Sequence, residues 1–213
     1  MLRQAEPTRQ LQQWLDRLAP LVAQAQATLR EVRPEKLALY SGGTLDADGN
    51  LRLALFWQEY VVAGPDFTVR RADTDQEVSS FIQCLILTYL VTADGTTPSG
   101  RWVSFRELPD GLFYAQAFQG YSGDRLVREL AGGLVAFCRA AKALGGRSLG
   151  IGDAGYAFDV LPRIHLAVVY WQGDEEFPSQ AQVLFEDTAA HYLPTDGLAI
   201  LGSQLVGHLL RAV

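Results

Sequence analysis

The chain has 213 residues, and a protein of this length buries about 70% of its surface in one sizeable core. With 48% hydrophobic and 20% charged residues, it is not a disordered, collagen-like or coiled-coil protein. A net charge of -6 gives no long-range attraction to polyanions, so nucleic acid is not an expected partner. No apolar run is long enough to cross a membrane, and Glu6 lies where a secretory signal would be apolar. We therefore expect a cytoplasmic protein without a membrane partner.

In the first half of the chain, apolar residues at three- and four-residue steps predict a peripheral helix over residues 8–32, bent or split at Pro20. A period near two then predicts strands over residues 37–40 and 51–56, joined by a type I′ turn at Asp48-Gly49. A short strand over residues 67–70 and a buried helix over residues 78–90 are expected next. Residues 92–100 form the longest predicted loop and a candidate hinge.

In the second half, short strands are predicted over residues 102–105 and 112–114. A helix over residues 126–141 follows, with Ser122 as its N-cap and Gly145-Gly146 as its stop. Residues 164–171 are apolar on both faces, which is typical of a strand inside a covered sheet. A neighbouring strand over residues 183–185 and a final helix after Pro194 complete the chain. Strands in clusters between helices predict a single α+β domain with a mostly antiparallel sheet.

The glycine-dense segment 146–155 fits two known motifs without their structural context. Gly150, Gly152 and Gly155 match a dinucleotide fingerprint, but a strand instead of a helix is predicted to follow. Ser148, with Asp187 and His191 downstream, has the chain order of a hydrolase triad, but a helix instead of a strand precedes it. We interpret the segment as a flexible connection.

Asp174, Glu175 and Glu176 directly follow the predicted central strand, which ends at Trp171. Crowded carboxylates can raise one another's pKa for acid-base chemistry, and with His191 they could bind a divalent metal. However, Gly173-Asp174 favours a turn, so a solvated hairpin loop is the preferred interpretation.

Residues 101–107 place arginines among aromatic residues. Strand alternation predicts Trp102, Ser104 and Arg106 on one face. Arg106 beside Trp102 could bind an anionic or aromatic ligand through fork-shaped hydrogen bonds and stacking, or it could pair with an internal carboxylate.

Several motifs occur in a fixed order along the chain, among them Gly100-Arg-Trp-Val-Ser-Phe-Arg-Glu-Leu-Pro, Gly152-Asp-Ala-Gly-Tyr-Ala-Phe-Asp-Val-Leu-Pro, Trp171-Gln-Gly-Asp-Glu-Glu-Phe-Pro and His191-Tyr-Leu-Pro. Together they resemble the bacterial family catalogued as domain of unknown function 3786. The resemblance covers about residue 51 to the C-terminus and implies no catalytic residue. Some members carry an N-terminal iron-sulfur domain, which implies a redox or one-carbon context. In this chain, Cys84 and Cys138 are too few to hold such a cluster, and we expect no cofactor or metal.

Three hypotheses follow. The preferred one is a non-catalytic accessory protein that binds a small molecule or a protein partner; its candidate residues are Trp102, Arg106, Trp171, Asp174, Glu175, Glu176 and His191. The second is a metal-assisted hydrolase or lyase that uses the acidic loop together with His191, which requires these side chains to converge. The third is a structural subunit of a homo-oligomer.

Overall fold

The computed structural model describes residues 9–213, with side chains from residue 18 onward. The chain forms two compact units, Met1–Gly95 and Thr96–Val213, which are each described by themselves. None of the helices in the described range is both long enough and apolar enough to span a membrane.

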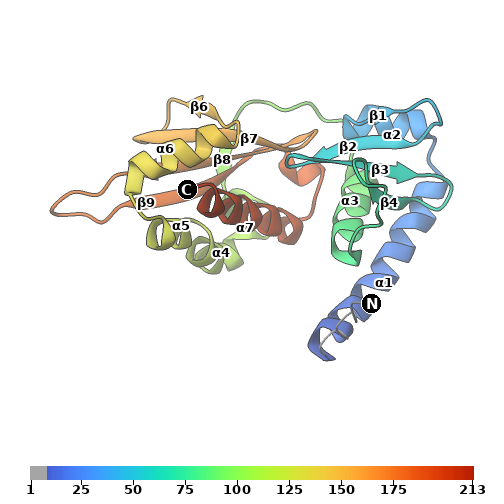
Figure 1. Cartoon of the computed structure of the whole chain (residues 1–213), viewed down its shortest axis with the longest axis horizontal. Coiled ribbons are helices and arrows are strands. Elements are labelled where there is room, and N and C mark those ends of the chain that lie inside the picture. The colour runs from blue at the N-terminus through green and yellow to red at the C-terminus, as the bar shows by residue number, and fades with distance from the viewer. Residues whose placement is uncertain (1–8) are drawn as a thin grey trace. The chain divides into compact units, whose positions relative to one another are not determined.

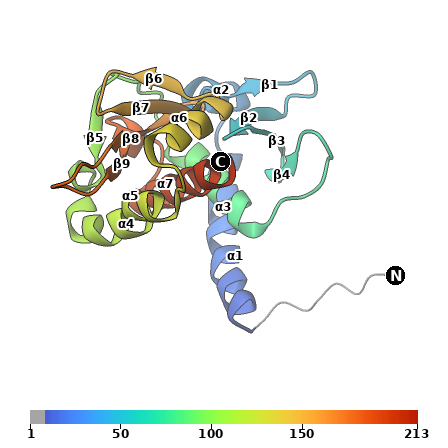
Figure 2. The same cartoon turned by 60° about the vertical axis from the view of Figure 1, so that its left-hand side comes forward.

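In the first unit, a four-stranded antiparallel sheet in the order β1-β2-β3-β4 packs on α3, and α1 packs on α3 (Figures 1 and 2). Its buried face is apolar because Leu51, Leu53 and Leu55 alternate along one strand. The elements are α1 (Arg9–Arg30), α2 (Pro34–Ser41), β1 (Thr44–Leu45), β2 (Leu51–Leu55), β3 (Gln58–Ala63), β4 (Thr68–Arg71) and α3 (Ser80–Thr92).

Most of the predicted elements of this unit are present, but the expected strand over residues 37–40 is helical. Pro34 stands in the first turn of α2, where a missing N–H costs nothing, and Gly42 ends the helix in the left-handed conformation. The hairpin is nevertheless real, because β1 takes the place of the predicted strand and Asp46 accepts hydrogen bonds from the backbone of Asp48 and Asn50. Its turn is not of type I′, because Gly49 has a positive φ but Asp48 does not. The first helix continues through Pro20; Thr8 lies outside the described residues.

The second unit is built on a five-stranded antiparallel sheet in the order β5-β9-β8-β7-β6. The predicted central strand, β8, is indeed in the middle, and both edge strands have only three residues. The strands are β5 (Trp102–Ser104), β6 (Arg147–Leu149), β7 (Ala154–Leu161), β8 (Ile164–Trp171) and β9 (Gln180–Glu186). The β7 strand confirms that a helix does not follow the glycine-rich segment, but the segment is not only a flexible connection, because it contains β6, which pairs with β7.

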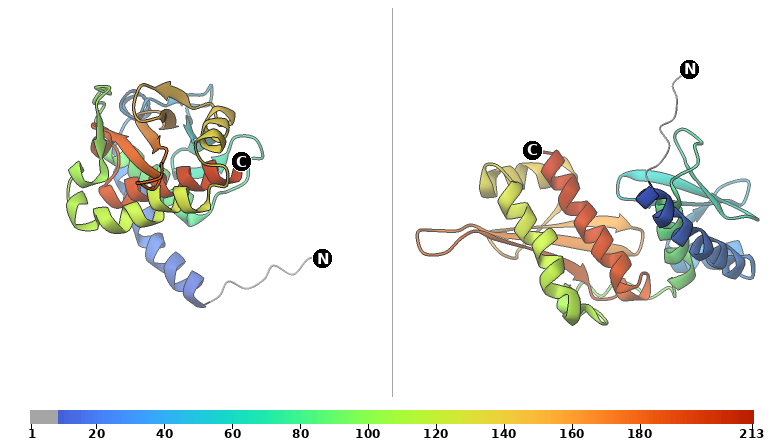
Figure 3. Two further views of the ribbon diagram at one scale, coloured as in Figure 1. Left: turned by 90° about the vertical axis from the view of Figure 1, so that its left-hand side faces the viewer. Right: turned by 90° about the horizontal axis from the view of Figure 1, so that it is seen from below.

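The helices of this unit cover one face of the sheet (Figure 3). Phe137 from α6 stacks on Tyr170 of β8, and Gly202 from α7 lies against Phe118 and Val183. The helices are η1 (Phe105–Glu107), η2 (Gly111–Tyr114), α4 (Ala115–Tyr121), α5 (Gly123–Glu129), α6 (Gly133–Ala143), η3 (Ala189–His191) and α7 (Thr195–Arg211).

Three sequence predictions in this unit are wrong. Residues 112–114 form the 3-10 helix η2 instead of a strand. The helix predicted over residues 126–141 is two helices, because Gly132 and Gly133 both have positive φ and break it. Ser122 does not cap α5, since its hydroxyl donates to the carbonyl of Phe118.

The fold class is α+β with antiparallel sheets, as predicted. That the two compact units act as a single domain stays a prediction.

Candidate functional site

The acidic residues 174–176 lie in the loop between β8 and β9. The Asp174 carboxylate accepts hydrogen bonds from the N–H groups of Glu176 and Phe177, both at 2.9 Å. These bonds, Phe177 first, hold the pKa of Asp174 below its ordinary value. Asp174, Glu175 and Glu176 are exposed. Their geometry is that of a solvated turn, the interpretation that the sequence favoured.

His191 lies beyond the opposite end of β9. Its Nδ1 is 3.3 Å from the Oγ1 of Thr96, whereas the acidic loop precedes Gln180. Because β9 runs from Gln180 to Glu186, about 20 Å of strand separates the two. Within residues 9–213, no cluster of three His, Cys, Asp or Glu residues is placed to hold a metal ion. The metal-assisted hypothesis requires the acidic loop and His191 to lie together, and in the described residues they do not.

The hydrolase triad suggested by Ser148, Asp187 and His191 is not formed either. Ser148 is on β6, and two strands separate β6 from β9. The Asp187 carboxylate instead accepts hydrogen bonds from Ser99 Oγ and from Arg101 Nε, the latter at 2.8 Å.

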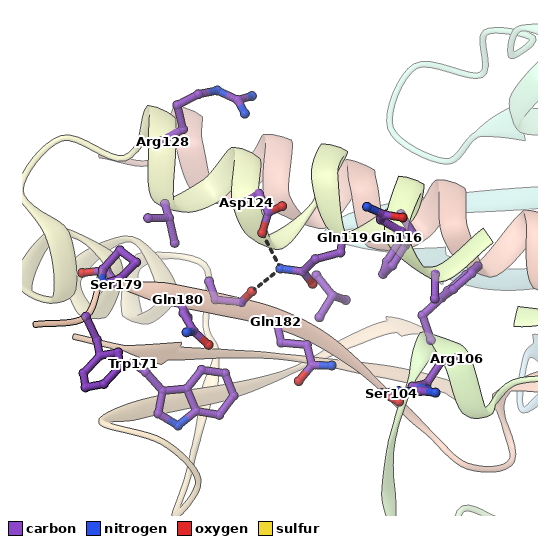
Figure 4. Close-up of a pocket in the computed structure, with 18 of the residues that line it drawn as sticks. Ser104, Arg106, Gln116, Gln119, Asp124, Arg128, Trp171, Ser179, Gln180 and Gln182 are labelled. Carbon is purple, nitrogen blue, oxygen red and sulfur yellow. Dashed lines mark hydrogen bonds between the residues drawn. The ribbon is translucent and has the colours of Figure 1, made fainter. Parts of the chain in front are cut away.

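Two of the predicted binding residues, Arg106 and Trp171, line one groove of about 920 Å³ (Figure 4). The groove follows β9 from Gln180 to Val183, with α4 and α5 on one side. Arg106 lies at one end of this stretch, and Ser179 lies toward the other. Phe105 and Phe118, whose ring centroids are 4.2 Å apart, belong to its wall. Two segments distant in sequence thus meet at one concave surface.

Arg106 is held on the rim by a local turn. Ser104 and Glu107 form a capping box, in which the Glu107 carboxylate accepts from the N–H and the hydroxyl of Ser104 at 2.8 and 2.7 Å. The strand therefore ends one residue earlier than predicted, and Arg106 belongs to η1. Arg106 is exposed and forms no hydrogen bond or ion pair with the described residues, although its charge acts on the neighbouring carboxylate of Glu107. The internal carboxylate partner that the sequence left open is thus not present.

Trp102 is on the same sheet face as Ser104, as predicted, but it lies opposite Glu186 and outside the groove.

Trp171 ends β8 directly opposite Gln180. Its side chain stays 37% exposed, and Phe177 of the adjoining loop is 65% exposed. Gly152 supports the indole from behind, since a Cβ there would lie 3.3 Å from Trp171 Cε2. Both aromatic side chains therefore present exposed ring surface in the lining of the groove.

Five glutamines line the groove, and the sequence analysis singled out none of them; Gln172 already accepts from the N–H of Leu134. Gln119 donates from Nε2 to Asp124 at 2.7 Å and to the carbonyl of Ala181 at 2.9 Å, so only its Oε1 remains for a ligand. The side-chain amides of Gln116, Gln180 and Gln182 form no hydrogen bond within the part of the chain that the structure describes. The alternation Gln180-Ala-Gln182 on a predicted strand was the signal that could have identified two of them.

A family model for a domain of unknown function (DUF3786) matches residues 33–208. The chain belongs to this family. The match begins within the first compact unit of the DUF3786 chain, covers most of the second, and confirms the resemblance in its sequence motifs. No curated protein and no solved structure matches it.

The side chains that line the groove of this DUF3786 chain include a cation, free amides and aromatic rings. None of the lining residues is His, Cys or Tyr. The hydroxyl of Ser104 donates to the Glu107 carboxylate, which the N–H of Ser104 also holds, and the hydroxyl of Ser179 accepts from the N–H of Gly173 at 2.9 Å.

Proposed function

We propose that this protein is a binding protein whose groove holds a ligand that bears a carboxylate. The observation that carries the proposal is the unpaired guanidinium of Arg106 on the rim of the same groove as the half-exposed Trp171. A planar guanidinium forms two parallel hydrogen bonds with a carboxylate, and an indole face stacks on flat or apolar groups. This supports the sequence-based hypothesis of an accessory protein without a catalytic role.

Titration calorimetry with a panel of carboxylates tests the proposal; suitable probes are benzoate, indole-3-acetate, phthalate and N-acetylated dipeptides that end in a free carboxylate. We expect at least one to bind, and Arg106→Ala to weaken it about 10–100-fold, since hydrogen bonds to charged groups contribute about 1.5–3 kcal/mol. Arg147→Ala, which removes an exposed arginine of β6, serves as the matched control and should leave the affinity unchanged. Equal affinities for wild type and Arg106→Ala would contradict the proposal.

A second candidate function, an oligomer subunit, is favoured by an apolar patch on η2. Leu112, Phe113 and Tyr114 are 58%, 90% and 53% exposed. Beside them, Tyr114, Tyr121 and α7 line a cavity of about 630 Å³. Exposed apolar patches of this kind are typical of protein interfaces.

If the η2 patch joins copies of this chain, sedimentation velocity should show a dimer or larger species that Phe113→Ser converts to a monomer. Val135→Ser is the control, because Val135 is 79% exposed on α6, away from the patch. A monomeric wild type, or an oligomer that Phe113→Ser leaves intact, would exclude this candidate.

We also propose a bacterial cytoplasmic location. Both cysteines, Cys84 and Cys138, are free thiols, which suits a reducing compartment. The net charge of -6 argues against nucleic acid as the ligand of the groove.

A further inference from the structure

We infer that the ligand of the groove is an extended peptide segment of a partner protein, with one carboxylate at Arg106 and an apolar side chain on Trp171 and Phe177. This inference rests on the proposed function and adds the chemical class of the ligand.

The spacing of the free amides carries the first step. Gln180 and Gln182 alternate on one face of β9, so their backbone positions are about 6.8 Å apart. The same distance separates every second residue of an extended peptide. Each glutamine amide offers both a donor and an acceptor, as does each peptide group. An extended chain lying along the edge of β9 therefore meets the amides of Gln180 and Gln182 from one face of the sheet, and that of Gln119 from the other face.

Gln119 presents a fixed hydrogen-bond acceptor to the ligand. Its Nε2 is held by Asp124 and by the carbonyl of Ala181, which fixes the side chain with Oε1 as the remaining acceptor. A ligand must therefore present a donor at this point, and a backbone N–H does so. Because the amide is already fixed, binding there costs little side-chain entropy.

The two ends of the groove define the sequence of the peptide. Arg106 lies at one end and Trp171 lies toward the other, with β9 residues 180–183 between them, and Phe177 is in the loop that leads into this second end of β9. Four strand residues span about 10 Å, so the carboxylate and the apolar side chain of the peptide should be about three residues apart in its sequence. The carboxylate can be a C-terminus or an Asp or Glu side chain, since both have the same chemistry.

Fluorescence polarisation with labelled random hexapeptides tests the inference. One library has free C-termini, a second is amidated with Glu fixed at one position, and a third has Gln in place of that Glu. A trimer of galacturonic acid, with phthalate as competitor, represents anionic ligands that are not peptides. We expect binding by the first or second library, which identifies the source of the carboxylate, and no binding by the third.

The groove variants assign the binding site. Arg106→Ala and the double variant Gln180→Ala/Gln182→Ala should each weaken the selected peptide at least about tenfold, as expected when hydrogen bonds worth about 1.5 kcal/mol are lost. Gln76→Ala, an exposed glutamine of the other unit, is the control, and the thermal transition of each variant verifies that it folds.

The outcomes separate the two proposals. Binding of galacturonate or phthalate that depends on Arg106, with no library bound, would overturn the peptide inference and leave the proposed function intact. Peptide binding that neither groove variant weakens would overturn both proposals, as would the absence of binding by every probe.

Discussion

Glu186→Ala is expected to lower the free energy of unfolding by about 3–5 kcal/mol, since hydrogen bonds to a charged group contribute about 1.5–3 kcal/mol each. Glu186 is only 2% exposed. Its carboxylate accepts from the N–H groups of Ser99, Gly100 and Thr188 and from the hydroxyl of Thr188. The substitution leaves these donors without an acceptor and releases residues 99–100 from β9. Urea unfolding followed by tryptophan fluorescence measures the loss, because Trp102 lies opposite Glu186.

The control is Glu175→Ala, an exposed carboxylate whose loss should change stability by no more than about 0.5 kcal/mol. A Glu186→Ala protein as stable as this control would show that the carboxylate does not hold the loop.

The stabilisation by Glu186 should also depend on pH. Burial alone would raise its pKa, but the hydroxyl and N–H of Thr188 and the N–H groups of Gly100 and Ser99 outweigh burial and lower the pKa. A lowered pKa means that the stabilisation is complete above the unfolded value of about 4.3 and is lost as the pH falls through the folded pKa. The stability difference between wild type and Glu186→Gln should therefore shrink below about pH 4. A difference that grows on acidification would contradict this assignment.

Gly123→Ala is expected to destabilise the second unit by about 3 kcal/mol, at the upper end of overpacking effects. A Cβ at residue 123 would lie 2.0 Å from the carbonyl oxygen of Ala181, which is backbone of β9 and cannot rotate away. The start of α5 would have to move off the strand, and the hydrogen bond from Gln119 to Ala181 would be lost with it.

Gly120→Ala in the neighbouring helix α4 is the matched control. Nothing lies within 4 Å of a Cβ at residue 120, so alanine should be neutral or stabilise the helix by up to about 1 kcal/mol. Thermal unfolding of both variants by circular dichroism measures the difference. Equal melting temperatures would show that α5 does not contact β9 as closely as described.

The fold was predictable where the pattern is long and local. The alternation along residues 164–171 identified the central strand, and the apolar stripe after Pro194 identified the last helix. The helical break at Gly132-Gly133 had a local signal in the glycine pair itself, but the apolar stripe from Leu126 to Ala141 predicted one continuous helix. Only the contact that completes the start of α6, in which the side chain of Gln172 accepts from the N–H of Leu134, joins residues 38 apart and leaves no local signal.

The site was predictable only in part. Arg106 and Trp171 were identified because arginine and tryptophan beside predicted strands are uncommon and chemically distinctive. The glutamines were not, because a glutamine gains meaning only from its neighbours: Gln119 and Ala181 are 62 residues apart in the chain and meet at β9. The acidic loop attracted attention through composition alone, and local turn bonds at Asp174 explain its residues.

The position of β8 in the sheet has a consequence for aggregation. The segment Ile164–Trp171, apolar on both faces, is the kind of sequence that forms intermolecular sheets. In the folded unit it pairs with β7 on one side and with β9 on the other, so it does not form an edge of the sheet. Protection from fibril formation therefore depends on keeping the second unit closed. A Glu186 variant that unfolds would therefore also expose β8, the strand most prone to aggregate.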